Sequence, residues 1–305
     1  MNKYLIIAPC FNEHLVIAKF LDELEQKLKA TNDSFVVIIV DDGSNDSTIE
    51  VLSSYQFTSE KFELKVIGLK FNMGHQEAIR QGLIYSKNLQ LDIDGVVVMD
   101  SDGEDDPNAI VELIQFRDSD IVFVQRGKRK ENLQFKTGYF FYRHLFRAVT
   151  GKKIAHGNYS FISPKVLDAI AYQSFIHYAG FLSKQKFNIE NFQYDRQKRI
   201  DGKSKMNYKN LVFHGLYSLV EYAEEILFSL IKLFGLIFIS LIFIGTYVLY
   251  SKFISHNAIS GWTSAIGANL VISSLVIIST IIIGLLLLSI KKSIHQKNEQ
   301  YYEIS

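Results

Sequence analysis

The chain has 305 residues, and its 33 Lys and Arg nearly balance its 32 Asp and Glu. This balance excludes a broadly basic surface for nucleic acid. The single cysteine, Cys10, excludes an internal disulfide and fits a reducing compartment. Because Met1 to Ala8 leads straight into a short apolar run and then charge, we expect no cleavable signal peptide.

Short apolar runs alternate with helical patterns over residues 1–205, which predicts an α/β fold with a doubly wound, mostly parallel sheet. The apolar runs predict buried strands at residues 4–9, 35–40, 64–69, 96–99 and 121–124. Helices are expected over 15–28, from about Thr48, over 77–86, and from near Pro107. Neither the ATPase phosphate-loop pattern nor the dinucleotide glycine pattern occurs.

Two of the predicted strands end in carboxylates. Asp41 and Asp42 follow the second strand, and Asp100 and Asp102 follow the fourth. The carboxyl ends of strands in such a sheet line its binding crevice. Two carboxylates there can hold Mg²⁺ or Mn²⁺, with water and phosphate completing the shell. The alternative is an ordinary acidic turn, in which Asp41 and Asp46 only cap a helix.

Four motifs stand in the order and spacing of family 2 glycosyltransferases. They are Pro9-x-Phe11-Asn12-Glu13, Val40-Asp41-Asp42-Gly43-Ser44-x-Asp46-x-Thr48, Asn72-x-Gly74-x-Gln76-x-Ala78-Ile79-x-x-Gly82 and Asp100-x-Asp102-x-x-Asp105-x-Pro107. The chain resembles the branch that contains dolichol-phosphate mannose synthase and the bacterial undecaprenyl-phosphate glucosyltransferases.

The resemblance implies a GT-A fold that binds a nucleotide sugar and a divalent metal, Mg²⁺ or Mn²⁺. The residues implied to bind the nucleotide sugar are Pro9, Asn12, Glu13, Asp41, Asp42, Gln76, Asp100 and Ser101. Asp100 and Asp102 would hold the metal and the diphosphate, with Asp102 also counted as catalytic.

The sequence departs from the family pattern at Gly157-Asn158-Tyr159-Ser160-Phe161, where the family often has Gly-Asp-Phe-Arg. Asn158 replaces the Asp and Ser160 replaces the Arg, so the acceptor-loop role of this segment and the sugar specificity stay open.

A basic stretch from Tyr194 to Met206 resembles the family segment Arg-x-x-Arg-x-x-Gly-x-Ser-Lys. Arg196, Arg199 and Lys205 are therefore expected to bind the acceptor phosphate and the donor diphosphate as catalytic residues. The alternative is contact with anionic lipid head groups alone. The Gln-x-x-Arg-Trp pattern of processive synthases is absent, which favours transfer of a single sugar.

The C-terminal third predicts a membrane hairpin. Spans at about 226–250 and 265–290 carry one charge, Lys232, and each is long enough for a hydrocarbon core of about 30 Å. The expected division is a catalytic domain at 1–205, an amphipathic juxtamembrane segment at 206–225, the hairpin at 226–290 and a tail at 291–305. Lysines flank the hairpin on both sides, which predicts cytoplasmic termini, in a bacterial inner membrane. A buried core hairpin is the alternative.

The predicted reaction moves one sugar, with inversion, from a nucleotide-diphosphate sugar to undecaprenyl or dolichyl phosphate, for cell-envelope glycan or protein glycosylation. The acceptor phosphate is already ionised at neutral pH, so no dedicated general base is expected. Two alternatives stay open: transfer to another lipid such as diacylglycerol or a ceramide, and a non-catalytic scaffold in a glycan flippase complex. The expected partners are the sugar donor, the polyprenyl phosphate and the bilayer, without nucleic acid; homo-oligomerisation through the apolar helices is left open.

Overall fold

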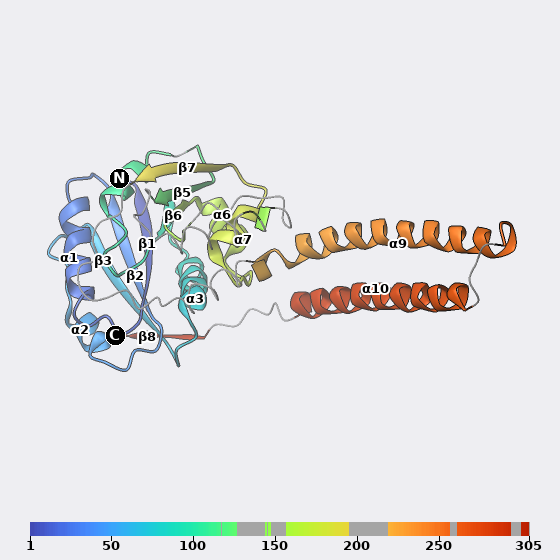
Figure 1. The fold of residues 1–305 in the computed structure, drawn as a ribbon. Coiled ribbons are helices and arrows are strands. Elements are labelled where there is room, and N and C mark those ends of the chain that lie inside the picture. The colour runs from blue at the N-terminus through green and yellow to red at the C-terminus, as the bar shows by residue number, and fades with distance from the viewer. Residues whose placement is uncertain are drawn as a thin grey trace, which may run out of the picture. The chain divides into compact units, whose positions relative to one another are not determined.

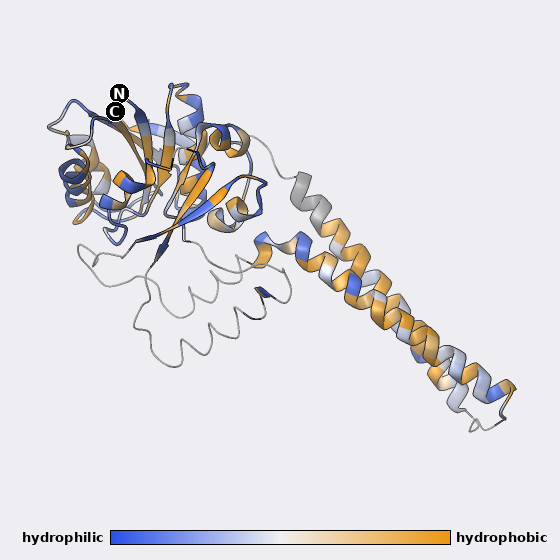
Figure 2. Ribbon diagram, turned by 90° about the horizontal axis from the view of Figure 1, so that it is seen from above, coloured by the Kyte–Doolittle hydropathy of each residue, from blue (hydrophilic) through white to orange (hydrophobic). Residues whose placement is uncertain are grey.

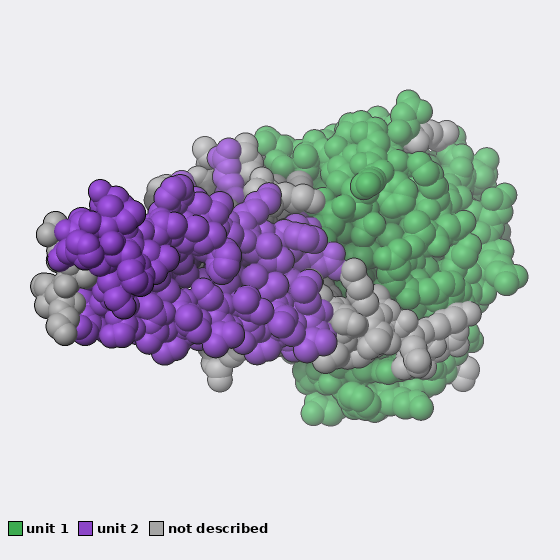
Figure 3. Space-filling view, turned by 90° about the vertical axis from the view of Figure 1, so that its right-hand side faces the viewer, with its two compact units in different colours: residues 1–140, 154–221, 296–305 green, residues 141–153, 222–295 purple. Residues whose placement is uncertain are grey.

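A computed structural model describes residues 1–116, 118–126, 144, 146–147, 157–194, 219–256, 261–293 and 300–304. The chain forms two compact units (Figure 3). Unit 1 comprises residues 1–140, 154–221 and 296–305, and unit 2 comprises residues 141–153 and 222–295. The chain therefore leaves unit 1 before the apolar helices and returns to it after them.

Unit 1 is built on an eight-stranded sheet in the order β7-β5-β6-β4-β1-β2-β3-β8 (Figure 1). The strands are β1 (Lys3–Cys10), β2 (Ser34–Asp41), β3 (Phe62–Leu69), β4 (Gly95–Val98), β5 (Ile121–Arg126), β6 (Ser160–Ile162), β7 (Ile189–Tyr194) and β8 (Tyr301–Ile304). β6 is antiparallel to β4 and β5, and β8 is antiparallel to β3, whereas the other pairs are parallel. The predicted mostly parallel α/β sheet is confirmed.

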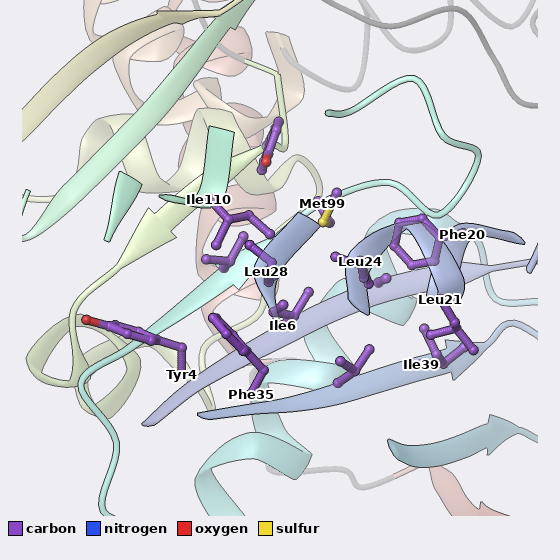
Figure 4. Packing of buried hydrophobic residues seen from close by; sticks show 14 of the residues in the cluster. Tyr4, Ile6, Phe20, Leu21, Leu24, Leu28, Phe35, Ile39, Met99 and Ile110 are labelled. Atoms are coloured by element: carbon purple, nitrogen blue, oxygen red, sulfur yellow. The ribbon is translucent and has the colours of Figure 1, made fainter. Parts of the chain in front are cut away.

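Helices cover both faces of this sheet, because successive strand residues point to opposite faces. The helices of unit 1 are α1 (Ile17–Leu28), α2 (Thr48–Ser54), α3 (His75–Asn88), α4 (Asn108–Leu113), α6 (Pro164–Ile170) and α7 (Tyr178–Lys184). On β1, Ile6 packs in one core cluster with Phe20 of α1 (Figure 4), while Leu5 packs in the other with Leu83 of α3. All four side chains are fully buried.

Strand β8 lies within residues 291–305, which were predicted from the sequence to be a tail. Its Tyr302 lies opposite Gly68 of β3, and a Cβ atom at Gly68 would stand 2.5 Å from the Tyr302 ring. Glycine at this position lets the ring lie over the strand, and a larger residue would require the ring to shift. Tyr301 packs edge-on against Tyr85 of α3, with ring centroids 5.3 Å apart, and its hydroxyl accepts from Asn88 Nδ2 at 3.0 Å. β8 thus covers the edge of the sheet beyond β3.

Unit 2 consists largely of two long apolar helices, α9 (Ala223–Phe253) and α10 (Trp262–Ser293), which Figure 2 shows as hydrophobic along most of their length. By length and composition, Ala223–Phe253 and Trp262–Leu287 are candidate membrane spans. The two helices approach closely at one glycine: a Cβ at Gly284 of α10 would stand 2.6 Å from Leu227 of α9. Close approach at glycine is typical of helix pairs in lipid.

Candidate active site at the carboxyl ends of the strands

The carboxylates at the end of β2, Asp41 and Asp42, are buried and bound by backbone groups. Asp41 and Asp42 have exposures of 0% and 3%. Asp41 Oδ2 accepts from the backbone N–H of Ser44 at 2.9 Å. Asp42 accepts from Met73 N at 2.7 Å through Oδ1, and from Gly74 N at 2.9 Å through Oδ2. Both side chains therefore hold loops in place.

The loop after β3 can approach Asp42 closely because of a glycine. Gly43 has a positive φ of 69°, and a Cβ there would stand 2.6 Å from the backbone carbon of Phe71. Burial raises the pKa of Asp42 above its ordinary value, although the N–H groups of Met73 and Gly74 act in the opposite direction.

The loop after β1 is tied to the loop after β2 by residues that the resemblance implies bind the nucleotide sugar. Asn12, at a positive φ of 54°, donates its backbone N–H to Ser44 Oγ at 2.9 Å and accepts from Asn45 N at 3.0 Å. Glu13 N donates to Thr48 Oγ1 at 2.9 Å. The structure thus brings Asn12, Glu13 and Asp41 together at the carboxyl ends of β1 and β2.

The loop after β4 is held differently. Asp105, 2% exposed, accepts from the backbone N–H of Asp100 at 3.0 Å, and Asp102 Oδ1 accepts from Glu104 N at 2.9 Å. Ser101 Oγ donates to the carbonyl of Pro9 at 2.8 Å, which joins this loop to β1. The Asp100 side chain stays 22% exposed. Asp105 belongs to the quoted motif, but its role as the acceptor that fixes Asp100 appears only in the structure.

An imidazole faces the Asp100 carboxylate. His75, the first residue of α3, places its Nε2 atom 3.2 Å from Asp100 Oδ1. The same nitrogen lies 3.0 Å from Nδ2 of Asn158. Burial lowers the pKa of His75, but the hydrogen bond and charge of Asp100, together with Asp42 and Asp102, raise it above its ordinary value overall. No role was predicted for His75 from the sequence.

Gln76, predicted to contact the donor, makes two protein contacts. Its Oε1 accepts from the backbone N–H of Tyr178 at 2.6 Å, and its Nε2 lies 3.5 Å from Asn158 Oδ1. The Ser160 hydroxyl lies 3.2 Å from the Tyr178 hydroxyl and donates to the carbonyl of Asn158 at 3.0 Å. The segment that departs from the family pattern therefore lies beside the acidic end of β4.

The carboxylates after β4 are the kind of ligand that a hard divalent cation prefers. Asp100 and Asp102 offer carboxylate oxygens; the Asp100 side chain is 22% exposed as a whole, although its Oδ1 atom is buried. Within the described ranges, no three His, Cys, Asp or Glu side chains gather into a metal cluster, so a cation here would take further ligands from water or phosphate. Arg196, Arg199 and Lys205, predicted to bind phosphate, lie outside the described residues.

Comparison with known proteins shows the family. The model of the family "Glycosyl transferase family 2" matches residues 5–170, more than half of the chain. A glycosyltransferase of Bacillus subtilis (strain 168), YkcC, whose function is uncharacterized, is 28% identical over 284 residues, covering 90% of this chain and 84% of its own. Dolichyl-phosphate beta-glucosyltransferase of Dictyostelium discoideum is 33% identical over 103 residues, covering 31% of this chain and 32% of its own.

Among solved structures, glucosyl-3-phosphoglycerate synthase from Mycobacterium tuberculosis, in complex with Mn²⁺ and UDP-glucose, is similar with a TM-score of 0.52. It is 13% identical, and the match covers 73% of this chain and 79% of that one. This likeness shows the GT-A type of fold. With the family match over residues 5–170, it leads to one conclusion: the chain is a glycosyltransferase and belongs to glycosyl transferase family 2.

Proposed function

We propose that this enzyme transfers one sugar from a nucleotide-diphosphate sugar to a polyprenyl phosphate, with inversion, at a membrane surface. The observation that carries the proposal is the partly open carboxylate end of β4, with Asp100 22% exposed, in a family 2 transferase that also has two candidate membrane spans. The name of the Dictyostelium relative, a dolichyl-phosphate glucosyltransferase, supports the acceptor class.

In this proposal Asp100 and Asp102 hold a divalent metal. When bound, the metal neutralises charge on the diphosphate that leaves the sugar. The buried Asp105 keeps the backbone of Asp100 in place, and the backbone N–H of Glu104 holds the carboxylate of Asp102. The site therefore presents negative charge where a cation and a diphosphate would meet.

The protein's other residues would bind and orient the two substrates. Pro9, Asn12, Glu13 and Asp41 are proposed to shape the nucleoside pocket, because the loops after β1 and β2 meet there. The Arg196, Arg199 and Lys205 side chains are proposed to orient the acceptor phosphate. An ionised phosphate attacks without a base, and one displacement inverts the sugar carbon.

The proposed membrane arrangement places the catalytic unit and both termini on the cytoplasmic side of a bacterial inner membrane. Chain connectivity supports it: the chain leaves unit 1 after Glu221, and β8 returns to the same sheet as β1. Two crossings, by α9 and α10, satisfy that connectivity. Lys291 and Lys292 after the second span agree with the positive-inside rule.

The test is a product assay on the purified full chain in lipid nanodiscs. Labelled nucleotide sugars are supplied with undecaprenyl phosphate, dolichyl phosphate, diacylglycerol or ceramide. We expect a labelled polyprenyl-phosphate sugar, lost in Asp102→Asn and kept in Asp118→Asn, which changes an exposed aspartate on another loop.

Other outcomes would contradict the proposal. Labelling of diacylglycerol or ceramide alone would overturn the acceptor class, and labelling of no lipid would favour a scaffold. Full activity of Asp102→Asn would refute the metal assignment.

A further inference from the structure

We propose that Glu221 is a positioning residue for the sugar donor: it holds the loop that leads into α7, and this loop orients the side chain of Gln76. The inference rests on the proposed function, because it concerns the donor of the same reaction. Glu221 is the last residue of unit 1 before the chain enters unit 2. No role was predicted for Glu221 from the sequence. The contacts of Glu221, of the loop at residues 176–178 and of Gln76 support the inference.

The side chain of Glu221 is buried and accepts backbone N–H groups. The residue is 3% exposed, and its Oε2 atom accepts from Ile176 N at 2.7 Å and from His177 N at 3.3 Å. Its backbone carbonyl accepts from Nζ of Lys184, the last residue of α7, at 2.9 Å. A buried carboxylate needs hydrogen bonds in place of its lost water. The loop before α7 supplies two of them.

The N–H groups at the start of α7 are bound by side chains, because the first N–H groups of a helix have no partner within it. The N–H of Tyr178 donates to Gln76 Oε1 at 2.6 Å. The N–H of Gly180 donates to Nδ1 of His177 at 3.0 Å. Glu221 binds the two N–H groups that come directly before Tyr178. The loop is therefore held by Glu221 on one part and by α3 on the next.

Gln76, predicted to bind the donor, takes its orientation from this loop. A backbone N–H can only donate, so the amide atom that faces Tyr178 N is the oxygen. The NH₂ group then faces Asn158 Oδ1, and this contact is long, at 3.5 Å. The NH₂ group keeps donor capacity for an oxygen of the nucleotide sugar. Asn158 contacts His75, which contacts Asp100, so the amide lies near the acidic end of β4.

Loss of the Glu221 carboxylate would reach Gln76 through the loop. The N–H groups of Ile176 and His177 would lack their acceptor, so the loop would have to shift to find another. Tyr178 is the next residue, and its N–H is the group that fixes the Gln76 amide. A substrate-binding group displaced by about 1 Å lowers the rate severely, even when the mutated residue is far from the chemistry.

The test compares donor kinetics of full-chain variants in lipid nanodiscs. The substrates are the nucleotide sugar and the lipid, among those supplied in the product assay, that give a labelled product. Glu221→Ala should raise KM for the nucleotide sugar about tenfold, with a smaller change in kcat. Glu221→Gln keeps one acceptor oxygen and should recover most of the loss. Glu221→Ala combined with Gln76→Ala should have a KM close to that of Gln76→Ala alone, because Glu221 acts through Gln76.

Glu25→Ala is the matched control for lost stability. Glu25 is also a buried carboxylate, 8% exposed, and it accepts the backbone N–H of Ser59 at 2.6 Å. This contact lies just before β3, at the amino ends of the parallel strands, whereas the site lies at their carboxyl ends. We expect Glu25→Ala to lower the melting temperature about as much as Glu221→Ala and to leave KM for the nucleotide sugar unchanged.

The other outcomes separate this inference from the proposed function. A KM in Glu221→Ala that matches Glu25→Ala, or fully additive effects with Gln76→Ala, would show that Glu221 is only structural. Glu221→Asp, one methylene shorter, carries the test if Glu221→Ala does not fold; a wild-type KM in that variant would contradict the inference. If only diacylglycerol or ceramide is labelled, the proposed acceptor is wrong, and the same KM comparison with that lipid still decides the role of Glu221. If no lipid is labelled, both are wrong.

Discussion

The acidic ends of β2 and β4 look alike in the sequence but differ in the structure. Asp41 and Asp42 are at most 3% exposed and accept backbone N–H groups, so their oxygens serve to hold loops. Asp100 is 22% exposed and faces an imidazole, and its own backbone is held by Asp105. A pair of carboxylates at a strand end is therefore a structural or a chemical feature according to what its oxygens already bind.

The largest expected effect is on activity at the β4 end. Asp100→Ala removes a proposed metal ligand while leaving the backbone bond to Asp105, so turnover should fall about 10³-fold, since a metal supplies several kcal/mol of charge stabilisation. Thermal unfolding should change little. Initial rates and melting curves of the full chain, with Asp118→Ala as control, measure both. A collapse in melting temperature without a specific loss of rate would place Asp100 with the structural carboxylates.

The next effect is on stability at the β2 end. Asp42→Ala leaves the N–H groups of Met73 and Gly74 without their acceptor, which should destabilise unit 1 by about 2–3 kcal/mol. Asp42→Asn keeps one oxygen and should lose less. Melting temperatures of the two variants test this. Equal stability of Asp42→Ala and the wild type would show that the loop contacts contribute nothing.

A smaller effect is expected for Asn158→Ala. The variant removes the amide that contacts His75 and Gln76 but keeps both carboxylates, so kcat/KM for the sugar donor should fall about tenfold, as for other outer-shell changes. Asn158→Gln, which has the same amide on a longer side chain, should recover only part of the loss. Kinetics with the donor varied measure the effect. An unchanged kcat/KM would separate Asn158 from the chemistry.

The smallest effect is a dependence of stability on pH. Burial raises the pKa of Asp42 above its ordinary value of 3.8, so its contribution to stability is full below that pH and is lost as pH rises through the raised pKa. Asp42→Asn cannot ionise. Its melting temperature should therefore improve relative to the wild type as pH rises from about 4 toward neutral. A difference in melting temperature between Asp42→Asn and the wild type that stays constant across this pH range would show that burial does not raise the pKa of Asp42.

The sequence predicted the strands that are continuous apolar runs and missed those that are not. The five predicted runs are β1 to β5. β6 has three residues, and β7, Ile-Glu-Asn-Phe-Gln-Tyr, lies at the sheet edge with exposed polar side chains, so neither gives a strong apolar signal. β8 is defined by its pairing with β3, from which more than 200 residues of chain separate it.

The site was predictable to a similar degree. Asp100 and Asp102 stand out because carboxylates follow an apolar run, and motif spacing supplied Gln76. The contact of His75 with Asp100 was not predictable, because it depends on how α3, β4 and β6 meet in space. The spacing of residues along the chain does not determine which elements pack together. For the same reason, the sequence could not show that the carboxylates after β2 and β4 differ in exposure and in hydrogen-bond partners.

The pairing of β8 with β3 has a consequence for how the protein is made. The ribosome finishes β3 long before it reaches Tyr301, and α9 and α10 are synthesised in between. Until then the edge of β3 has no permanent neighbour, and Gly68 has no tyrosine ring over it. Completion of the catalytic sheet therefore has to wait for α9 and α10, so a defect in the formation of these two helices should also appear as a folding defect in the enzyme domain.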